Sequence, residues 1–112
     1  MISDRCISDL QQIHDSFAEV EEKNAADCGY NTAVFCIKEG ISTRISLLRD
    51  IHEEPTSSPG YVSDALEFIE GLLKVIGECT DETDEDIRPG YVRALDELVR
   101  KITPTLEWLN KI

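Results

Sequence analysis

The densest group of ionisable side chains in this sequence lies in one short segment of its second half. The segment ECTDETDED, residues 78–86, contains no base and supplies half of the formal net charge of −12. A cluster of this kind attracts cationic surfaces and speeds association with them. The segment is therefore the strongest candidate for a binding site. Its carboxylates are those of Glu78, Asp81, Glu82, Asp84, Glu85 and Asp86.

Three interpretations of residues 78–86 stay open. The segment can be a solvated loop whose last acids favour the N-terminus of the next helix. It can be a docking surface for a partner protein with a basic surface. It can also bind calcium, but its spacing lacks the D-x-[DN]-x-[DN]-G loop with its distal Glu, so no preformed calcium site is predicted. Direct binding of nucleic acid is not expected, because phosphate binding needs Lys and Arg.

Residue patterns that indicate catalysis are scarce. His14 and His52 have no sequence-adjacent ligand or nucleophile pattern. The sequence also lacks a phosphate-binding loop, a Gly-rich fingerprint and a G-x-S-x-G element. A di-metal site in a helical bundle would need Glu-x-x-His on two helices, and none occurs. We therefore predict no enzyme activity, no catalytic or metal-binding residues, and no cofactor.

The cysteines and the N-terminus indicate a cytoplasmic protein. The cysteine spacing contains no C-x-x-C, and disulfides are rare in the cytosol. Two disulfides or a metal site are the alternatives to reduced, structural thiols, which we favour. The first ten residues, MISDRCISDL, lack the basic and apolar regions of a secretory signal, and no apolar run approaches the ~20 residues that span a bilayer. The cysteines are Cys6, Cys28, Cys36 and Cys79.

The elements that must position these residues are helices. Apolar residues recur at helical spacing in four segments, and no segment alternates with the period of a strand. Short connections between amphipathic helices predict an all-α, up-down-up-down four-helix bundle in a single domain, residues 1–112. The four apolar stripes are Cys6, Leu10, Ile13, Phe17 and Val20; Val34, Ile37, Ile41, Ile45 and Leu48; Val62, Leu66, Ile69, Leu73 and Ile76; and Val92, Leu95, Val99, Ile102, Leu106 and Leu109.

Gly and Pro residues predict where these helices begin and end. Gly-Tyr pairs at 29/30, 60/61 and 90/91 predict three turn-to-helix junctions of near-equal spacing. Residues 53–60 and 77–90 are the predicted second and third connections. Asn31 or Thr32 is the predicted cap of the second helix. Pro104 falls inside the fourth stripe, so the fourth helix is expected to be kinked or broken there.

Three features do not fit a simple bundle. Arg44 falls inside the apolar face of the second helix, which predicts either a side chain that snorkels to the surface or an interior ion pair. Trp108 points away from its stripe, so it is either an exposed binding residue or is buried by a rotation at Pro104. Tyr61, Phe68 and Val75 widen the third stripe, as a broad core face or as a homodimer seam or partner groove.

These observations predict an acidic, cytoplasmic module that binds another protein. Its most concrete form is an inhibitor of the immunity-protein or antitoxin type, or a nucleic-acid mimic, that blocks a basic site on its partner. The likeness to acidic helical immunity proteins is one of class, without a shared motif. The alternative is a small chaperone or adaptor that binds a partner helix through the flank of the third helix. The predicted partner-binding residues are Asp81, Glu82, Asp84, Glu85, Asp86, Tyr91 and Trp108.

Overall fold

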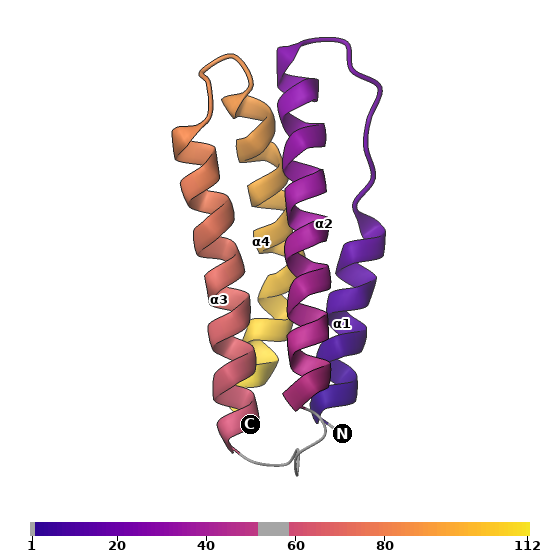
Figure 1. Ribbon diagram of the computed structural model, residues 1–112, viewed down its shortest axis with the longest axis vertical. Helices are drawn as coiled ribbons and strands as arrows, with labels where there is room; N and C mark the ends of the chain where they lie inside the picture. Colours follow the sequence, from indigo (N-terminus) through magenta and orange to yellow (C-terminus); the bar gives the residue numbers. More distant parts are fainter. Residues whose placement is uncertain (1, 52–58) are drawn as a thin grey trace.

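The protein consists of four α-helices packed side by side (Figure 1). The computed structural model describes residues 2–51 and 59–112, and within these ranges it contains no strand. The all-α, four-helix prediction is confirmed. The predicted linker at 53–60 and the residue His52 lie outside the described residues, except that positions 59 and 60 already belong to a helix. The helices are α1 (Ile2–Ser16), α2 (Ala25–Ile51), α3 (Pro59–Glu82) and α4 (Arg88–Lys111).

The helices α2 and α4 form the centre of the bundle. Their mutual contact is the most extensive of any helix pair, and α1 and α3 flank them (Figure 1). Both chain termini lie at one end of this elongated body, while the connections 17–24 and 83–87 lie at the other. The molecule extends over 48 × 22 × 21 Å along its three principal axes. Two connections that are far apart in the sequence are thus brought to the same end.

The core follows the predicted stripes on α1 and α2 but only in part on α3, where three of the five predicted residues are half-buried, and on α4. Cys6, Ile37 and Ile69 are fully buried members of the first three stripes. On α4, Val92 and Val99 are exposed instead of buried. The buried face of α4 is rotated away from them, because α4 packs mainly against α2 and turns its smaller residues inward. That face consists of Gly90, Tyr91, Ala94, Leu98, Ile102, Thr105 and Leu109.

Two of the Gly-Tyr pairs mark the closest approach of α2 and α4. A side-chain carbon at Gly90 would collide with the carbonyl of Ala26 and the amide of Tyr30, and one at Gly29 would collide with the carbonyl of Ile87. Only glycine allows backbones to come this close. The prediction that Gly29 separates two helices is wrong, since Gly29 lies inside α2.

The helix α2 begins earlier than predicted because Asn24 caps it. The Asn24 side-chain oxygen accepts a 2.9 Å hydrogen bond from the amide of Asp27, which satisfies one of the free donors of the first turn. The Asp27 carboxylate in turn accepts a 2.9 Å bond from the amide of Lys23. The predicted caps Asn31 and Thr32 therefore lie inside the helix and have other partners.

The helix α4 runs without a break from Arg88 to Lys111, with Pro104 inside it. The predicted interruption at Pro104 does not occur. The hydroxyl of Thr103, next to the proline, donates to the carbonyl of Val99 within the same helix at 2.5 Å. Seven residues of a buried face, extending on both sides of the proline, hold this helix against the bundle and outweigh the single hydrogen bond that proline removes.

Candidate functional site

The acidic segment 78–86 is only partly a loop. The helix α3 extends to Glu82, so Glu78, Asp81 and Glu82 are helical and the connection to α4 is limited to residues 83–87. This corrects the prediction of a long acidic loop. The extension places the carboxylates on the last turns of α3 and on a tight turn, closed by a 3.0 Å bond from the Arg88 amide to the Asp84 carbonyl. The six carboxylates of residues 78–86 are all exposed.

A second acidic segment lies at the same end of the bundle. The connection 17–24 carries Glu21 and Glu22, both exposed, and it leads into α2 at the end where 83–87 lies (Figure 1). The two ends are in direct contact, because Ile87 packs its backbone against Gly29 of α2. We call this surface the acidic end. Its exposed carboxylates are those of Glu21, Glu22, Asp81, Glu82, Asp84, Glu85 and Asp86.

Two arginines near the acidic end, Arg88 and Arg93, are occupied by other partners. The Arg88 guanidinium donates to the carbonyls of Thr80 at 3.3 Å and of Thr83 at 2.6 Å. These carbonyls lie at and just after the C-terminus of α3, where a cation is favourable. Arg93 forms a 3.4 Å ion pair with Asp27. The exposed carboxylates therefore keep most of their charge available to a partner.

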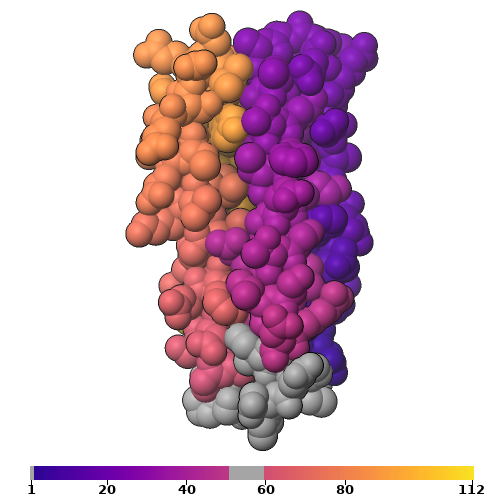
Figure 2. All heavy atoms as spheres, viewed as in Figure 1, coloured from indigo at the N-terminus to yellow at the C-terminus, as the bar shows by residue number. Residues whose placement is uncertain are grey.

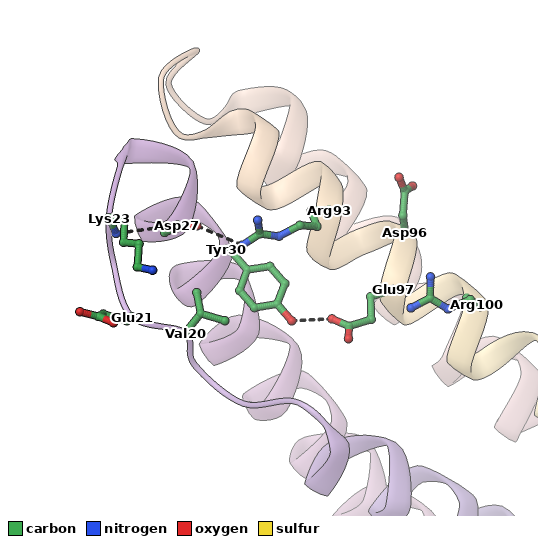
Figure 3. A pocket seen from close by; sticks show the side chains of 9 residues that line it. All are labelled: Val20, Glu21, Lys23, Asp27, Tyr30, Arg93, Asp96, Glu97 and Arg100. Carbon is green, nitrogen blue, oxygen red and sulfur yellow. Dashed lines mark hydrogen bonds and ion pairs between the residues drawn. The ribbon is translucent and has the colours of Figure 1, made fainter.

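A groove of about 720 Å³ lies beside the acidic end (Figure 3). One wall is the connection 17–24, the floor is the first half of α2, and the other wall is α4. The groove exists because α1 ends at Ser16 and the thinner connection takes its place beside α2 and α4. Its lining combines both charges with one exposed apolar side chain: Val20, Glu21, Lys23, Asp27, Tyr30, Arg93, Asp96, Glu97 and Arg100.

The groove contains a chain of hydrogen bonds between α2, α4 and α1. The Tyr30 hydroxyl donates to the Glu97 carboxylate at 2.5 Å. Lys101 reaches the same carboxylate at 3.2 Å and donates to the Ser16 hydroxyl at 2.9 Å. Burial and this bond raise the pKa of Tyr30 to about 12. Burial alone would raise the pKa of Glu97, but the hydrogen bonds from Tyr30 and Lys101 and the nearby positive charges hold it below its ordinary value.

Arg93 covers the buried ring of Tyr30. Its guanidinium carbon lies 4.3 Å from the ring centroid, a cation–π geometry, while the ion pair with Asp27 fixes its orientation (Figure 3). The floor of the groove is thus made of rigid, already paired groups. By contrast, Glu21 and Asp96, like Lys23 and Arg100, have side chains without an ion-pair partner among the described residues. These four exposed charges are available to a ligand with charges of both signs.

Asn31 holds the connection 17–24 in place. It is buried, and its side chain accepts from the amide of Val20 and donates to the carbonyl of Val20, each at 2.8 Å. Lys38 adds a 2.9 Å bond to the carbonyl of Phe17. An extended segment has no internal hydrogen bonds, so these side chains satisfy its backbone. They define the wall of the groove.

Neither of the two predicted aromatic residues is an exposed part of the acidic end. Tyr91 is 7 % exposed and belongs to the core, so the prediction of an exposed ring at 91 is wrong. The reason is the rotated face of α4, which turns Tyr91 inward. Trp108 is half-buried near the other end of α4, with the Arg5 guanidinium 4.1 Å from its ring centroid. Tyr91 is therefore buried at the acidic end, and Trp108 lies near the opposite end of α4.

The flank of α3 is mostly core. Tyr61 is 2 % exposed, Phe68 packs against the core, and Val75 is 48 % exposed. Of the two interpretations of this flank, a broad core face describes Tyr61 and Phe68. Only Val75 is accessible to a partner helix, so these three residues do not form a continuous exposed apolar strip.

Sequence reasoning missed the groove residues Tyr30, Arg93 and Glu97. Each has an ordinary helical context, and Tyr30 and Glu97 are 67 positions apart. The signal that pointed toward them was the glycine beside each of Tyr30 and Tyr91, which marks where α2 and α4 meet. That signal was interpreted as a helix boundary.

Comparisons with protein-family models, with curated proteins and with solved structures found no match to this chain. Residues 2–51 and 59–112 contain no helix with the length and apolar character that a membrane crossing requires. In the same ranges no three His, Cys, Asp or Glu side chains are grouped as metal ligands. The four cysteines are free thiols, and burial raises the pKa of the Cys6 thiol to about 11.

Proposed function

We propose that this protein is an acidic binding module that inhibits a partner with a basic site, in the manner of an immunity protein, an antitoxin or a nucleic-acid mimic. The observation that carries the proposal is the acidic end. The last turn of α3 and two connections far apart in the sequence place seven exposed carboxylates at one end of the bundle, while Arg88 and Arg93 are engaged elsewhere. Such a concentration destabilises the fold through self-repulsion, and binding a cationic surface would relieve that cost.

The proposed mechanism has two parts. The acidic end attracts the basic surface of the partner over a distance of about a Debye length, ~8 Å at physiological salt, and orients it. A segment of the partner then lies in the adjacent groove, where Val20 offers apolar contact and Glu21 and Asp96 accept basic side chains. Lys23 and Arg100 select a segment that also carries acidic residues. The rigid floor of Tyr30, Arg93 and Glu97 lowers the entropic cost of binding.

The proposal includes finer points of the sequence predictions. We infer that the helices run up-down-up-down, that Pro104 kinks α4 without breaking it, and that the module acts in the cytoplasm without enzymatic activity. These points are consistent with the apolar stripes and with the lack of catalytic motifs in the sequence. They are independent of the identity of the partner.

The test compares two charge variants with equal net charge. The first neutralises Asp81, Glu82, Asp84, Glu85 and Asp86 as amides. The control neutralises five exposed carboxylates elsewhere, those of Glu39, Asp50, Glu67, Glu70 and Glu107. The partner is captured from the native host with the unmodified protein, and its association rate is measured at low and high salt.

We expect the first variant to lose association rate by at least about tenfold and to lose most of its salt dependence, with a much smaller loss in the control. Equal losses in both variants would show that only net charge matters. An unchanged rate in the first variant would remove the acidic end from the mechanism.

A further inference from the structure

The helix α4 carries a second apolar row beside its buried face. Val92 and Val99 are 42 % and 43 % exposed, and Leu95 and Leu106 are half-buried. Their spacing of three, four and seven positions places them on one side of the helix, as in the contact seam of a coiled coil. A surface helix normally has polar residues outside its buried face. The row therefore adds apolar surface that the bundle does not cover.

This row lies on the side of α4 that faces α3. Arg88 is on the same side, one turn before Val92, and its guanidinium donates a 3.3 Å hydrogen bond to the carbonyl of Thr80 on α3. Another side of α4 faces α1, since Lys101 donates to the Ser16 hydroxyl at 2.9 Å. The exposed valines thus border the contact between α3 and α4.

A second apolar row, on α3, borders the same contact. The opposite flank of α3 faces α2, because Arg44, which is half-buried and has no ion pair among the described residues, donates a 2.8 Å bond to the carbonyl of Phe68. Figure 2 shows that face, where α2 and α3 lie side by side and largely hide α4. On the α4 flank, Leu66 and Leu73 are half-buried. A side-chain carbon at Gly77, one turn after Leu73, would meet nothing within 4 Å, so this part is open.

Four exposed charges surround these two rows. Glu70 and Lys74 lie one turn apart on α3, where they share a shallow hollow with Leu66. Asp96 and Arg100 lie one turn apart on α4. None of the four has an ion-pair partner among the described residues. Lys74 and Asp96 lie equally far from the tight turn that joins the helices, and so do Glu70 and Arg100. The charges therefore alternate around the apolar surface.

We propose that this surface, the α3–α4 face, pairs with the same face of a second copy of the chain, with the two copies antiparallel. The face consists of Leu66, Leu73, Val92, Leu95 and Val99 with the four charges around them.

In this two-fold arrangement α3 lies on α3 and α4 lies on α4. Glu70 is then opposite Lys74 of the second copy, and Asp96 is opposite Arg100 of the second copy. Each contact occurs twice because the interface is self-complementary. The apolar rows pack between the two charged edges, and the charges fix the register.

The acidic ends determine the orientation. A parallel two-fold pair would also join opposite charges, by laying α3 on α4, but it would bring two acidic ends together. In the antiparallel pair the acidic ends lie at opposite ends of a body 48 Å long. Charges separated by much more than the Debye length, ~8 Å at physiological salt, are largely screened. The net charge of −12 per chain is therefore compatible with antiparallel pairing.

Sedimentation equilibrium at physiological salt, over a range of protein concentrations, measures this association. We expect a monomer–dimer equilibrium with a dissociation constant below about 0.1 mM. Weaker association, or assemblies larger than a dimer, would overturn the proposal, and a monomer would leave the face to a different protein. The measurement needs no inhibited partner, so its result is independent of the proposed function.

Two valines of similar exposure provide matched variants. Val99 lies on the α3–α4 face, whereas Val75, 48 % exposed, lies on the α3 flank that contains Phe68. We expect Val99→Ser to weaken the dimer by at least about tenfold, because each dimer loses two buried valines. Val75→Ser should leave the dissociation constant unchanged. Equal effects of the two variants would refute the assignment of the interface.

A charge exchange on α3 tests the orientation. Lys74→Glu places acid opposite acid twice in each dimer and should weaken it by about tenfold. Adding Glu70→Lys restores opposite charges only if the copies are antiparallel, and we expect it to recover the original affinity. The control adds Glu39→Lys on α2 instead, which gives the same net charge and should not recover it. No recovery with Glu70→Lys, or equal recovery in both double variants, would contradict the antiparallel pairing.

Discussion

The hydroxyl of Tyr30 and the carboxylate of Glu97 are joined by a 2.5 Å hydrogen bond that links the first half of α2 to the middle of α4. The bond lies at the edge of the groove, where Arg93 covers the ring and Lys101 extends the network to α1. The same residues therefore stabilise the central helix pair and shape the candidate binding surface. Substitutions of Tyr30 and Glu97 therefore test both roles.

Replacing Tyr30 with Phe should destabilise the protein by about 2 kcal/mol, because a hydrogen bond to a charged group contributes roughly 1.5–3 kcal/mol. Urea unfolding monitored by circular dichroism measures this change. The partner variant Glu97→Gln and the double variant complete a cycle that isolates the coupling between the two residues. Strictly additive losses would show that the bond contributes nothing to stability.

We predict that the protein loses stability at alkaline pH, because the pKa values of all three tyrosines are raised in the folded state. Burial raises the pKa of Tyr30 and of Tyr61 to about 12, and it also raises the pKa of Tyr91. Since the folded pKa values exceed the unfolded value of 10.0, their contribution is complete below pH ~10 and declines as pH rises toward ~12. Tyrosinate absorbance should therefore appear together with the cooperative loss of helix. Early ionisation of a tyrosine in the folded protein would contradict this.

Replacing Asn31 with Ala should release the connection 17–24. Two partly buried hydrogen bonds to the Val20 backbone disappear, and the free energy of unfolding should fall by about 2 kcal/mol. Hydrogen exchange at the Val20 amide should accelerate more than exchange at amides in the middle of α4. A uniform acceleration along the chain would mean that Asn31 contributes only to global stability. Thr32→Ala serves as a control, since its hydroxyl bonds within α2 on an exposed position.

Gly90→Ala should be among the most damaging single-methyl additions in this chain. The new carbon meets backbone atoms of Ala26 and Tyr30, which cannot move without separating α2 from α4. We expect a loss of at least about 3 kcal/mol, beyond the usual cost of overpacking. Gly77→Ala on α3 should instead be neutral or raise stability by up to ~1 kcal/mol, as expected for Ala in a helix. Thermal melts of the two variants make the comparison, and similar midpoints would contradict the close approach.

The sequence predicted the helices well because their signal is local. Apolar residues at every third or fourth position can be buried only if the segment is helical, and Ile37, Ile41 and Ile69 are buried for this reason. Boundaries were less predictable. Asn24 and Asn31 are both plausible caps, and the choice between them depends on Val20, which Asn31 binds after the chain has folded.

The candidate site could be predicted only in part. The exposure of Asp84, Glu85 and Asp86 followed from their density, since unpaired charges remain in water. The inward turn of Tyr91 did not follow, because the rotation of α4 depends on which helix it packs against. Val92 and Val99 fit the helical period as well as Ala94 and Leu98 do, and the contact with α2 decides which set is buried.

By itself, the sequence determined that this protein is helical, that apolar residues at helical spacing on four segments supply its core, and that its negative charge is concentrated near residue 80. These properties depend on the residue types and on spacing within one helix. The tertiary structure decided which helices meet, and with that the pairing of Tyr30 with Glu97, the groove and the acidic end. The contact of α2 with α4 at Gly29 and Gly90 was not predictable from the sequence. A side chain at these positions collides only with the backbone of the facing segment, and that segment is adjacent only in the folded protein.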